Sequence, residues 1–462
     1  MKDNVGVLLP VFSLPGSYGI GDFGQCCYSF INWLKKNNFK YWQILPLNPI
    51  GPGNSPYMSI CSNAIEYRYI SIENIEGFIF NEEEAKTATN KVNYQYSGKI
   101  KEKALHQAYI SFFNEEYKSK LDKFIRSNEW VKNYAIFQIL SKKNKNAYWN
   151  NWTKGDIEYL KRYKSVQEKY LPEFYYYVFE QYIAYKQWKN VLKYANKNGI
   201  QIISDTPFYV GVNSVECWSN PKLFKFDENY QQTEVGGVPP DYFNEEGQLW
   251  GSPIYNFDLM KKNNYKWFIS RIEYQLKLCN ILRIDHFRAF DSYYVIPLGE
   301  TAKHGKWVDG PSYDFFDEFF KHLPTANIIA EDLGSNLDRV HKLRNHYHIP
   351  GMYVAQFDFF NYEKWGGENQ IVYTGTHDND TLKDWYKSLD ENQINVIKDR
   401  TQCFDNPFIG LIDVILNKMP SKITIIPLQD LLGLDNKSRI NVPGTMKNNW
   451  KWKLKDNSWS KL

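Results

Sequence analysis

Acidic side chains recur directly after runs of apolar residues in this chain. Asp205, Asp285, Glu331 and Asp378 each come at or shortly after the end of such a run, and His377 precedes the last of them. A set of carboxylates gathered at one place suits two chemistries. With a divalent metal ion they serve as ligands. Without one they suit glycosyl transfer, in which one carboxylate attacks the sugar and another protonates the departing oxygen.

The arginine two positions before Asp285 favours glycosyl transfer over metal binding. Residues two apart on a strand face the same side, so Arg283 is expected to lie beside Asp285 and keep it ionised, as a nucleophile requires. Glu331, close to other acids, is expected to have a raised pKa and to act as the proton donor. Each signal alone is weak, because a single acid at a strand end is more often a helix cap or a salt-bridge partner. Their recurrence at four strand ends strengthens the prediction.

The apolar runs themselves predict the strands that position these acids. Several are uninterrupted rather than alternating, which is typical of parallel strands covered on both faces. Helical patterns lie between them, and the alternation predicts an α/β fold, a closed (β/α)8 TIM barrel. Active sites of such barrels lie at the C-terminal ends of the strands, where the acids are found. The eight runs are residues 5–9, 41–45, 200–204, 281–284, 328–330, 352–357, 371–374 and 423–427.

Two connections between the predicted strands are too long for simple crossovers. We interpret residues 48–188 as a largely helical insertion after the second strand, and residues 207–262 as an insertion after the third. Both are expected to lie over the C-terminal face of a single catalytic barrel, residues 1–462. The second contains a segment rich in glycine and proline, residues 236–251, which we expect to form a lid loop over the active site.

Composition excludes several classes of partner. A net charge of +4, from 56 Lys+Arg against 52 Asp+Glu, gives no electrostatic basis for binding nucleic acid or a membrane surface. No stretch approaches the roughly 20 apolar residues that span a bilayer, and the N-terminus resembles no secretory signal. The six cysteines show no zinc-site spacing and are expected to be reduced thiols. These observations predict a cytoplasmic protein.

Eight motifs, in order along nearly the whole chain, resemble those of the amylomaltases, or 4-α-glucanotransferases, which are relatives of the α-amylases. The family's opening motif, its lid segment and its catalytic segments each have a counterpart in this sequence. They are SLPGSYGIGD at 13–22, WQILPL at 42–47, GNSPY at 53–57, GVPPDYF at 237–243, GQLWG at 247–251, RIDHFR at 283–288, IAEDLG at 329–334 and YTGTHDND at 373–380.

The resemblance implies a role for each matching residue. Asp285 matches the nucleophile, Glu331 the general acid/base, and Asp378 the third carboxylate, which holds sugar hydroxyls. The remaining matches are residues that support, cover or stack on bound glucose units. These substrate-binding residues are Tyr57, Asp205, Asp241, Gln248, Trp250, Arg283 and His377.

The resemblance also implies a retaining transferase of carbohydrate metabolism that needs no cofactor and no metal. Its donors would be malto-oligosaccharides, and its acceptors glucose or an α-glucan such as glycogen or starch. The chain departs from the family pattern at Pro52, where an aromatic residue is common, and at residues 213–218. No sequence is found for the α-amylases' C-terminal β-sandwich domain.

Two alternatives remain open at this point. An α-amylase-type hydrolase would use the same carboxylates with water as the acceptor, so the catalytic motifs do not separate it from a transferase. A non-catalytic glycan-binding barrel would lack one of the catalytic carboxylates, and none is missing. The lid motif and the missing C-terminal domain favour transfer.

Overall fold

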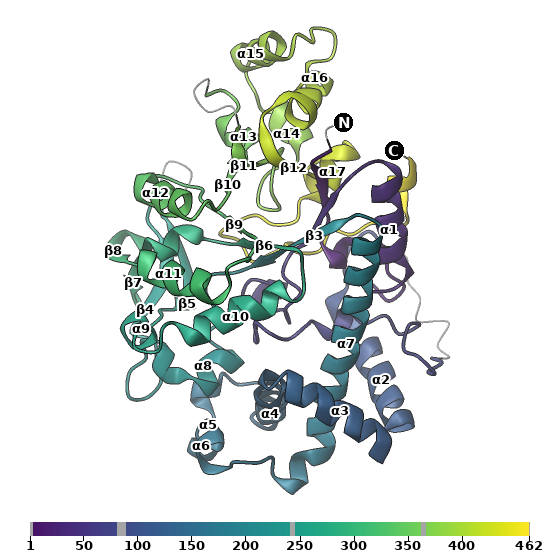
Figure 1. Ribbon diagram of the computed structural model, residues 1–462, viewed down its shortest axis with the longest axis vertical. Coiled ribbons are helices and arrows are strands. Elements are labelled where there is room, and N and C mark those ends of the chain that lie inside the picture. Colours follow the sequence, from purple (N-terminus) through teal and green to yellow (C-terminus); the bar gives the residue numbers. More distant parts are fainter. Residues whose placement is uncertain (1–2, 81–88, 241–244, 362–365, 462) are drawn as a thin grey trace.

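The fold is organised around an eight-stranded parallel sheet (Figure 1). The computed structural model describes residues 3–80, 89–240, 245–361 and 366–461. Every ladder in this sheet is parallel, and the strand order is β10-β11-β12-β1-β2-β3-β6-β9. The strands are β1 Val5–Leu8, β2 Tyr41–Gln43, β3 Gln201–Thr206, β6 Ile281–Ile284, β9 Ile328–Ala330, β10 Gly351–Val354, β11 Gly367–Tyr373 and β12 Ser421–Pro427.

The two edge strands of this sheet approach each other and nearly close a barrel. The backbone N–H of Ala330, in β9, donates to the carbonyl oxygen of Pro350, directly before β10, at 2.9 Å. The predicted (β/α)8 barrel is therefore confirmed, with each of the eight predicted runs overlapping one observed strand.

Side chains from the strands fill the interior of the barrel. One buried cluster gathers ten apolar residues from seven of the eight strands, so the barrel is a packed core and not a pore. Burial on both faces explains why the runs are continuously apolar. The cluster consists of Leu8, Ile203, Ile281, Ile329, Met352, Val354, Ile371, Tyr373, Ile423 and Ile425.

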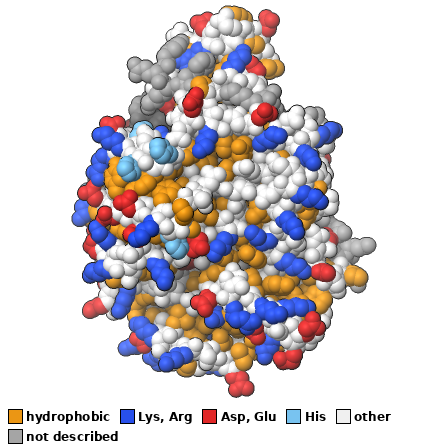
Figure 2. All heavy atoms as spheres, viewed as in Figure 1, with side chains coloured by type: hydrophobic (Ala, Val, Ile, Leu, Met, Phe, Trp, Pro, Cys, Tyr) orange, Lys and Arg blue, Asp and Glu red, His pale blue; other side chains and the backbone are white. Residues whose placement is uncertain are grey.

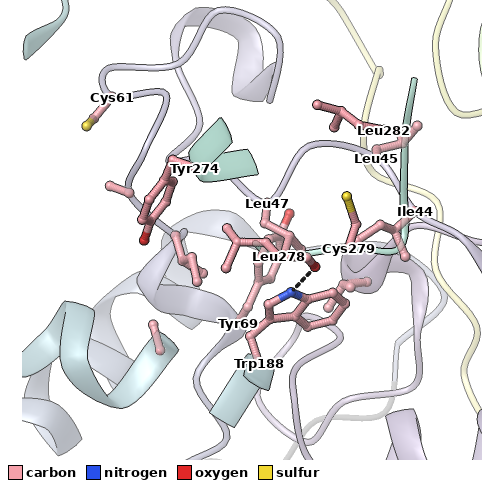
Figure 3. Packing of buried hydrophobic residues seen from close by; sticks show 14 of the residues in the cluster. Ile44, Leu45, Leu47, Cys61, Tyr69, Trp188, Tyr274, Leu278, Cys279 and Leu282 are labelled. Carbon is pink, nitrogen blue, oxygen red and sulfur yellow. Dashed lines mark hydrogen bonds between the residues drawn. The ribbon is translucent and has the colours of Figure 1, made fainter. Parts of the chain in front are cut away.

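Helices cover the outside of the barrel, and the longest is α7 (Leu171–Lys197). Its Trp188 is fully buried and packs near Leu47, Tyr69 and Leu278, while its indole N–H donates to the carbonyl of Leu278 at 2.8 Å (Figure 3). The other helices outside the β2–β3 connection are α1 Gln25–Lys36, α8 Val215–Ser219, α9 Phe257–Lys261, α10 Lys266–Leu276, α11 Ser312–His322, α12 Asp338–His346, α13 Ala355–Asp358, α14 Leu382–Lys387, α15 Glu391–Thr401, α16 Pro407–Asp413 and α17 Leu428–Leu431.

The connection from β2 to β3 contains a group of helices that lie together at the lower end of Figure 1. They are α2 Tyr94–Phe112, α3 Glu115–Ser127, α4 Trp130–Lys143, α5 Lys154–Ile157 and α6 Tyr159–Arg162. Helices α2, α3 and α4 pack on α7. Residue 188, the predicted end of this insertion, falls inside α7, which runs unbroken into the barrel wall. The boundaries of both insertions stay predictions.

A second sheet, at the left of Figure 1, was not predicted. It is antiparallel, with the order β5-β4-β7-β8 and the bounds β4 Glu234–Val238, β5 Gln248–Pro253, β7 Ser292–Pro297 and β8 Lys306–Asp309. Most of the described part of the predicted lid loop, residues 236–251, is therefore not a loop but two paired strands. Gly236 and Gly237 mark an irregularity in the pairing, and pairing of β4 with β7 outweighs the turn preference of these glycines.

The distribution of charged side chains on the surface is consistent with the near-equal numbers of basic and acidic residues. On the face shown in Figure 2, basic and acidic side chains are interspersed rather than gathered into a patch of one sign. All six cysteines are free thiols. Within the described ranges, no helix is both long and apolar enough to cross a membrane.

Candidate active site

Strands β3 and β6 bring an arginine between two carboxylates. Asp205 and Arg283 are direct partners in the parallel ladder. The guanidinium of Arg283 donates from Nη1 to Oδ2 of Asp205 at 2.6 Å and to Oδ1 of Asp285 at 3.0 Å. The hydroxyl of Tyr57, from the segment after β2, donates to the same Oδ2 of Asp205 at 2.8 Å. Asp205 and Arg283 are almost fully buried, whereas the side chain of Asp285 is 30% exposed and lies at the mouth of the barrel.

Two opposing effects act on the pKa of Asp285. Its pKa is raised from the ordinary value of 3.8 to about 7, first by burial and then by the charges of Asp205 and Asp378. Arg283 lowers it by charge and by hydrogen bonding. Arg283 thus acts in the predicted direction, but burial is the larger effect, so the pKa of Asp285 is raised overall.

Glu331 follows β9 and faces the same site. Its Oε2 accepts the backbone N–H of His286 at 2.7 Å, and His286 adopts a left-handed conformation with φ of 53°. The pKa of Glu331 is raised to about 8, first by burial and then by the charge of Asp285, while Arg283 opposes both effects. Neighbouring acids were the predicted cause of a raised pKa, and burial is the larger one. Because the pKa of Glu331 is raised and Arg283 is bonded to Asp285, the pair can hold one proton, on Glu331, beside a negative charge on Asp285.

The loop after β11 brings His377 and Asp378 to this mouth. His377 stacks on Tyr57 with ring centroids 5.2 Å apart and an interplanar angle of 16°. Burial lowers the pKa of His377, so its imidazole is neutral at pH 7, and its Nε2 lies 3.3 Å from Oδ1 of Asp378. The side chain of Asp378 is 41% exposed. Of the three proposed catalytic acids it is therefore the one that reaches furthest toward solvent.

The strand β5 places an aromatic wall beside the carboxylates. The indole of Trp250 lies edge-to-face against the ring of His286, with centroids 4.7 Å apart, and 6.3 Å from Tyr209. Its Nε1–H donates to Oε1 of Gln248 at 3.0 Å. Trp250 thus lies next to the residue that follows Asp285, and Gln248 is bonded to its indole. Asp241 falls outside the described residues.

Several residues of this site were not predicted from the sequence. His286 and Tyr209 stand inside or next to recognised segments, and only their contacts give them a role. Arg439, Asn441 and Trp450 come after the last strand, yet they contact Asp378, His377 and Tyr57. No spacing rule joins residues sixty or more positions apart. The only signal in the sequence was an unassigned segment that contains Asn, Pro and Gly and ends in a tryptophan.

The described residues hold no group of three or more His, Cys, Asp or Glu side chains suited to a metal ion. Instead, an arginine-bonded carboxylate and a carboxylate of raised pKa stand at the mouth of a (β/α)8 barrel. The C-terminal mouth is where barrel enzymes have their active sites, and a pair of carboxyl groups of which one can donate a proton is what cleavage of a glycosidic bond requires.

Comparison with known proteins identifies the family. The family model of the 4-alpha-glucanotransferases matches residues 9–458. The 4-alpha-glucanotransferase of Aquifex aeolicus is 37% identical over 477 residues, covering 98% of this chain and 95% of the relative. That of Clostridium butyricum is 38% identical over 478 residues, covering 97% and 95%. The solved amylomaltase from Streptococcus agalactiae in complex with acarbose has a TM-score of 0.92 and 34% identity, covering 98% and 95%. The chain therefore belongs to the 4-alpha-glucanotransferase family, as its motifs indicated.

Proposed function

We propose that this chain transfers α-1,4-glucan segments from a donor malto-oligosaccharide to the 4-hydroxyl of an acceptor glucan by a retaining double displacement. The observation that carries the proposal is the pairing of Asp285, bonded to Arg283 at 3.0 Å, with Glu331, whose pKa is raised to about 8. One carboxylate can attack while the other still holds a proton, which is the state that glycosyl transfer requires.

In the first step, a carboxylate oxygen of Asp285 attacks the anomeric carbon of the donor. The bond from that carbon to the glycosidic oxygen breaks, and the proton of Glu331 passes to the leaving oxygen, which releases the shortened glucan. A glycosyl ester on Asp285 remains.

In the second step, the Glu331 carboxylate takes the proton of an acceptor 4-hydroxyl. The acceptor oxygen attacks the anomeric carbon, and the ester bond to Asp285 breaks. Both carboxyl groups return to their initial protonation states, and the two inversions give net retention.

The other predicted residues take supporting roles. Asp378 would hold sugar hydroxyls and favour the flattened ring of the transition state. Arg283 and Asp205, with Tyr57 and His377, would form the wall of the same subsite. Trp250 would stack on a glucose ring, and Gln248 would orient its indole. Asp241 would also cover the bound glucan, a role that we propose from the sequence motif in which it stands.

Malto-oligosaccharides are the proposed donors and glucose or an α-glucan such as glycogen or starch the proposed acceptor, with no cofactor. The relative that was solved with acarbose supports a binding site of this kind. A cytoplasmic location remains part of the proposal, supported by the six free thiols.

Incubation with maltotriose and separation of the products tests this function. Transfer gives glucose together with a ladder of chains longer than the substrate. A hydrolase gives only shorter products, and a glycan-binding barrel gives none. Asp285→Asn should abolish the ladder, and a ladder that survives in this variant would exclude the proposed nucleophile.

A further inference from the structure

Residues 439–450, here called the C-terminal strap, follow β12, α17 and the short turn Asn436–Ser438 and lie against the loop that carries His377 and Asp378. The guanidinium of Arg439 donates to the backbone carbonyl of Asp378 and to the carboxylate of Asp380. Its Nε also donates to the carbonyl of Asn441 at 2.8 Å. The strap and the loop are therefore joined by a network of hydrogen bonds.

Asn441 makes the two contacts closest to the reacting groups. Its backbone N–H donates to the carbonyl oxygen of His377 at 3.1 Å. Its side-chain amide donates to Oδ1 of Asp378 at 2.7 Å. Among the described residues, the hydrogen bond from Asn441 and the ion pair with His377 are the polar interactions of this carboxylate, and His377 lies further away, at 3.3 Å. The terminal torsion of an aspartate is broad, so a carboxylate that is 41% exposed keeps one orientation only when a partner holds it.

Trp450 fixes the other end of the strap behind the same site. Its indole packs against Tyr57 and His377, with centroids 5.7 Å and 5.9 Å away. It is buried and adopts a left-handed backbone with φ of 62°, which is costly for a bulky residue and persists only where the surroundings impose it. The hydroxyl of Tyr94 donates to its carbonyl at 2.7 Å, and its N–H donates to the carbonyl of Ile440 at 2.7 Å.

We propose that Asn441, in the C-terminal strap, is a positioning residue that orients the Asp378 carboxylate in the donor-side sugar site. The inference rests on the proposed role of Asp378 in the transition state. A carboxylate that hydrogen-bonds sugar hydroxyls binds them best when its orientation is fixed before the sugar binds. The amide of Asn441 engages one oxygen and leaves the other toward the open mouth.

Asn441→Ala and Asn441→Asp test this role. Because a hydrogen bond to a charged group is lost, Asn441→Ala should lower kcat on the order of 10- to 100-fold while KM for maltotriose changes less than about threefold. Asn441→Asp should be worse, since it sets a carboxylate against Asp378 in place of a donor. A merely structural role would lower the melting temperature without this separation of kcat from KM.

Asn449 offers a matched control in the same strap. Its side chain holds the strap's own turn, donating to the carbonyls of Val442 at 3.3 Å and Thr445 at 2.9 Å and accepting from the N–H of Val442 at 3.1 Å. Asn449→Ala should destabilise the protein but leave kcat within about threefold of the original. An equal loss of kcat in the two alanine variants would overturn the specific role of Asn441.

A double-mutant cycle separates the inference from the function on which it rests. With α-maltotriosyl fluoride as donor, Asn441→Ala should cost less than about threefold in the Asp378→Asn background, because the group that it orients is already lost. A full additive loss overturns the positioning role. If Asp378→Asn alone leaves turnover unchanged, the proposed role of Asp378 fails, and the inference fails with it.

Discussion

Removing the charge of Arg283 should move the pH profile of the enzyme to the alkaline side. Its guanidinium contacts both Asp205 and Asp285 and lowers the pKa of Asp285 and of Glu331. Arg283→Met keeps most of the side-chain volume but removes this effect from both carboxyls. The carboxyl of Asp285, whose pKa is about 7 with the arginine in place, would then bind its proton more tightly.

The size of the effect follows from the position of the guanidinium. An adjacent arginine lowers a carboxyl pKa by about 1–3 units, so its loss should raise the pKa of Asp285 by a similar amount and reduce the fraction of Asp285 that is ionised at pH 7. The corresponding drop in kcat/KM at pH 7 is about 5- to 500-fold. Because Glu331 shifts in the same direction, both limbs of the bell-shaped profile move upward, and activity recovers in part above pH 8.

The assay is kcat/KM for maltotriose from pH 5 to pH 10, by coupled detection of released glucose. Arg283→Lys is the control, since it keeps a positive charge and should shift the profile less. The methionine variant also breaks a buried ion pair at a cost of about 3–5 kcal/mol, so folding is checked by circular dichroism at each pH. A profile that falls in height without moving would refute the electrostatic role of Arg283.

Two further outcomes follow from the same site. The pKa of Glu331 lies at about 8 in the folded protein against an ordinary 4.5, so the wild type loses stability as pH rises between these values, where the unfolded chain has already released the proton. Glu331→Gln should therefore melt at the same temperature as wild type at pH 4 and at a higher temperature at pH 9; an equal difference at both pH values would contradict the shift. Trp250, which covers His286, should help to exclude water, so Trp250→Ala should raise the number of new reducing ends per bond cleaved. If only total activity falls, Trp250 binds glucan without shielding the intermediate.

The barrel could be predicted because its signals are local. Each strand is a short apolar run, and the rule that active sites gather at the C-terminal ends of barrel strands then places Asp285 and Glu331 together without any long-range information. That rule does not predict which residues of neighbouring strands pair, so the pairing of Asp205 with Arg283 is known only from the structure. Only the structure shows that one guanidinium serves two carboxylates and that burial outweighs its effect on Asp285.

The parts that escaped prediction depend on contacts between distant segments. The strand β4 contains Gly236 and Gly237, which favour turns in isolation, and pairing with β7 decides its conformation. Asn441 and Trp450 stand in a segment with no periodicity, and their roles arise from contacts with residues 63 and more positions away. Sequence patterns report such positions only as unassigned polar or aromatic residues.

The covalent intermediate tests the central claim most directly. Glu331→Gln is incubated with α-maltotriosyl fluoride whose terminal 4-hydroxyl is blocked, so that the first step needs no acid and the second lacks its base. The protein is then digested with pepsin at low pH, and its peptides are analysed by mass spectrometry. The account predicts one maltotriosyl ester, carried by Asp285 and absent from the variant that also bears Asp285→Asn. An adduct on another carboxylate, or release of a product with inverted configuration and no adduct, would contradict it.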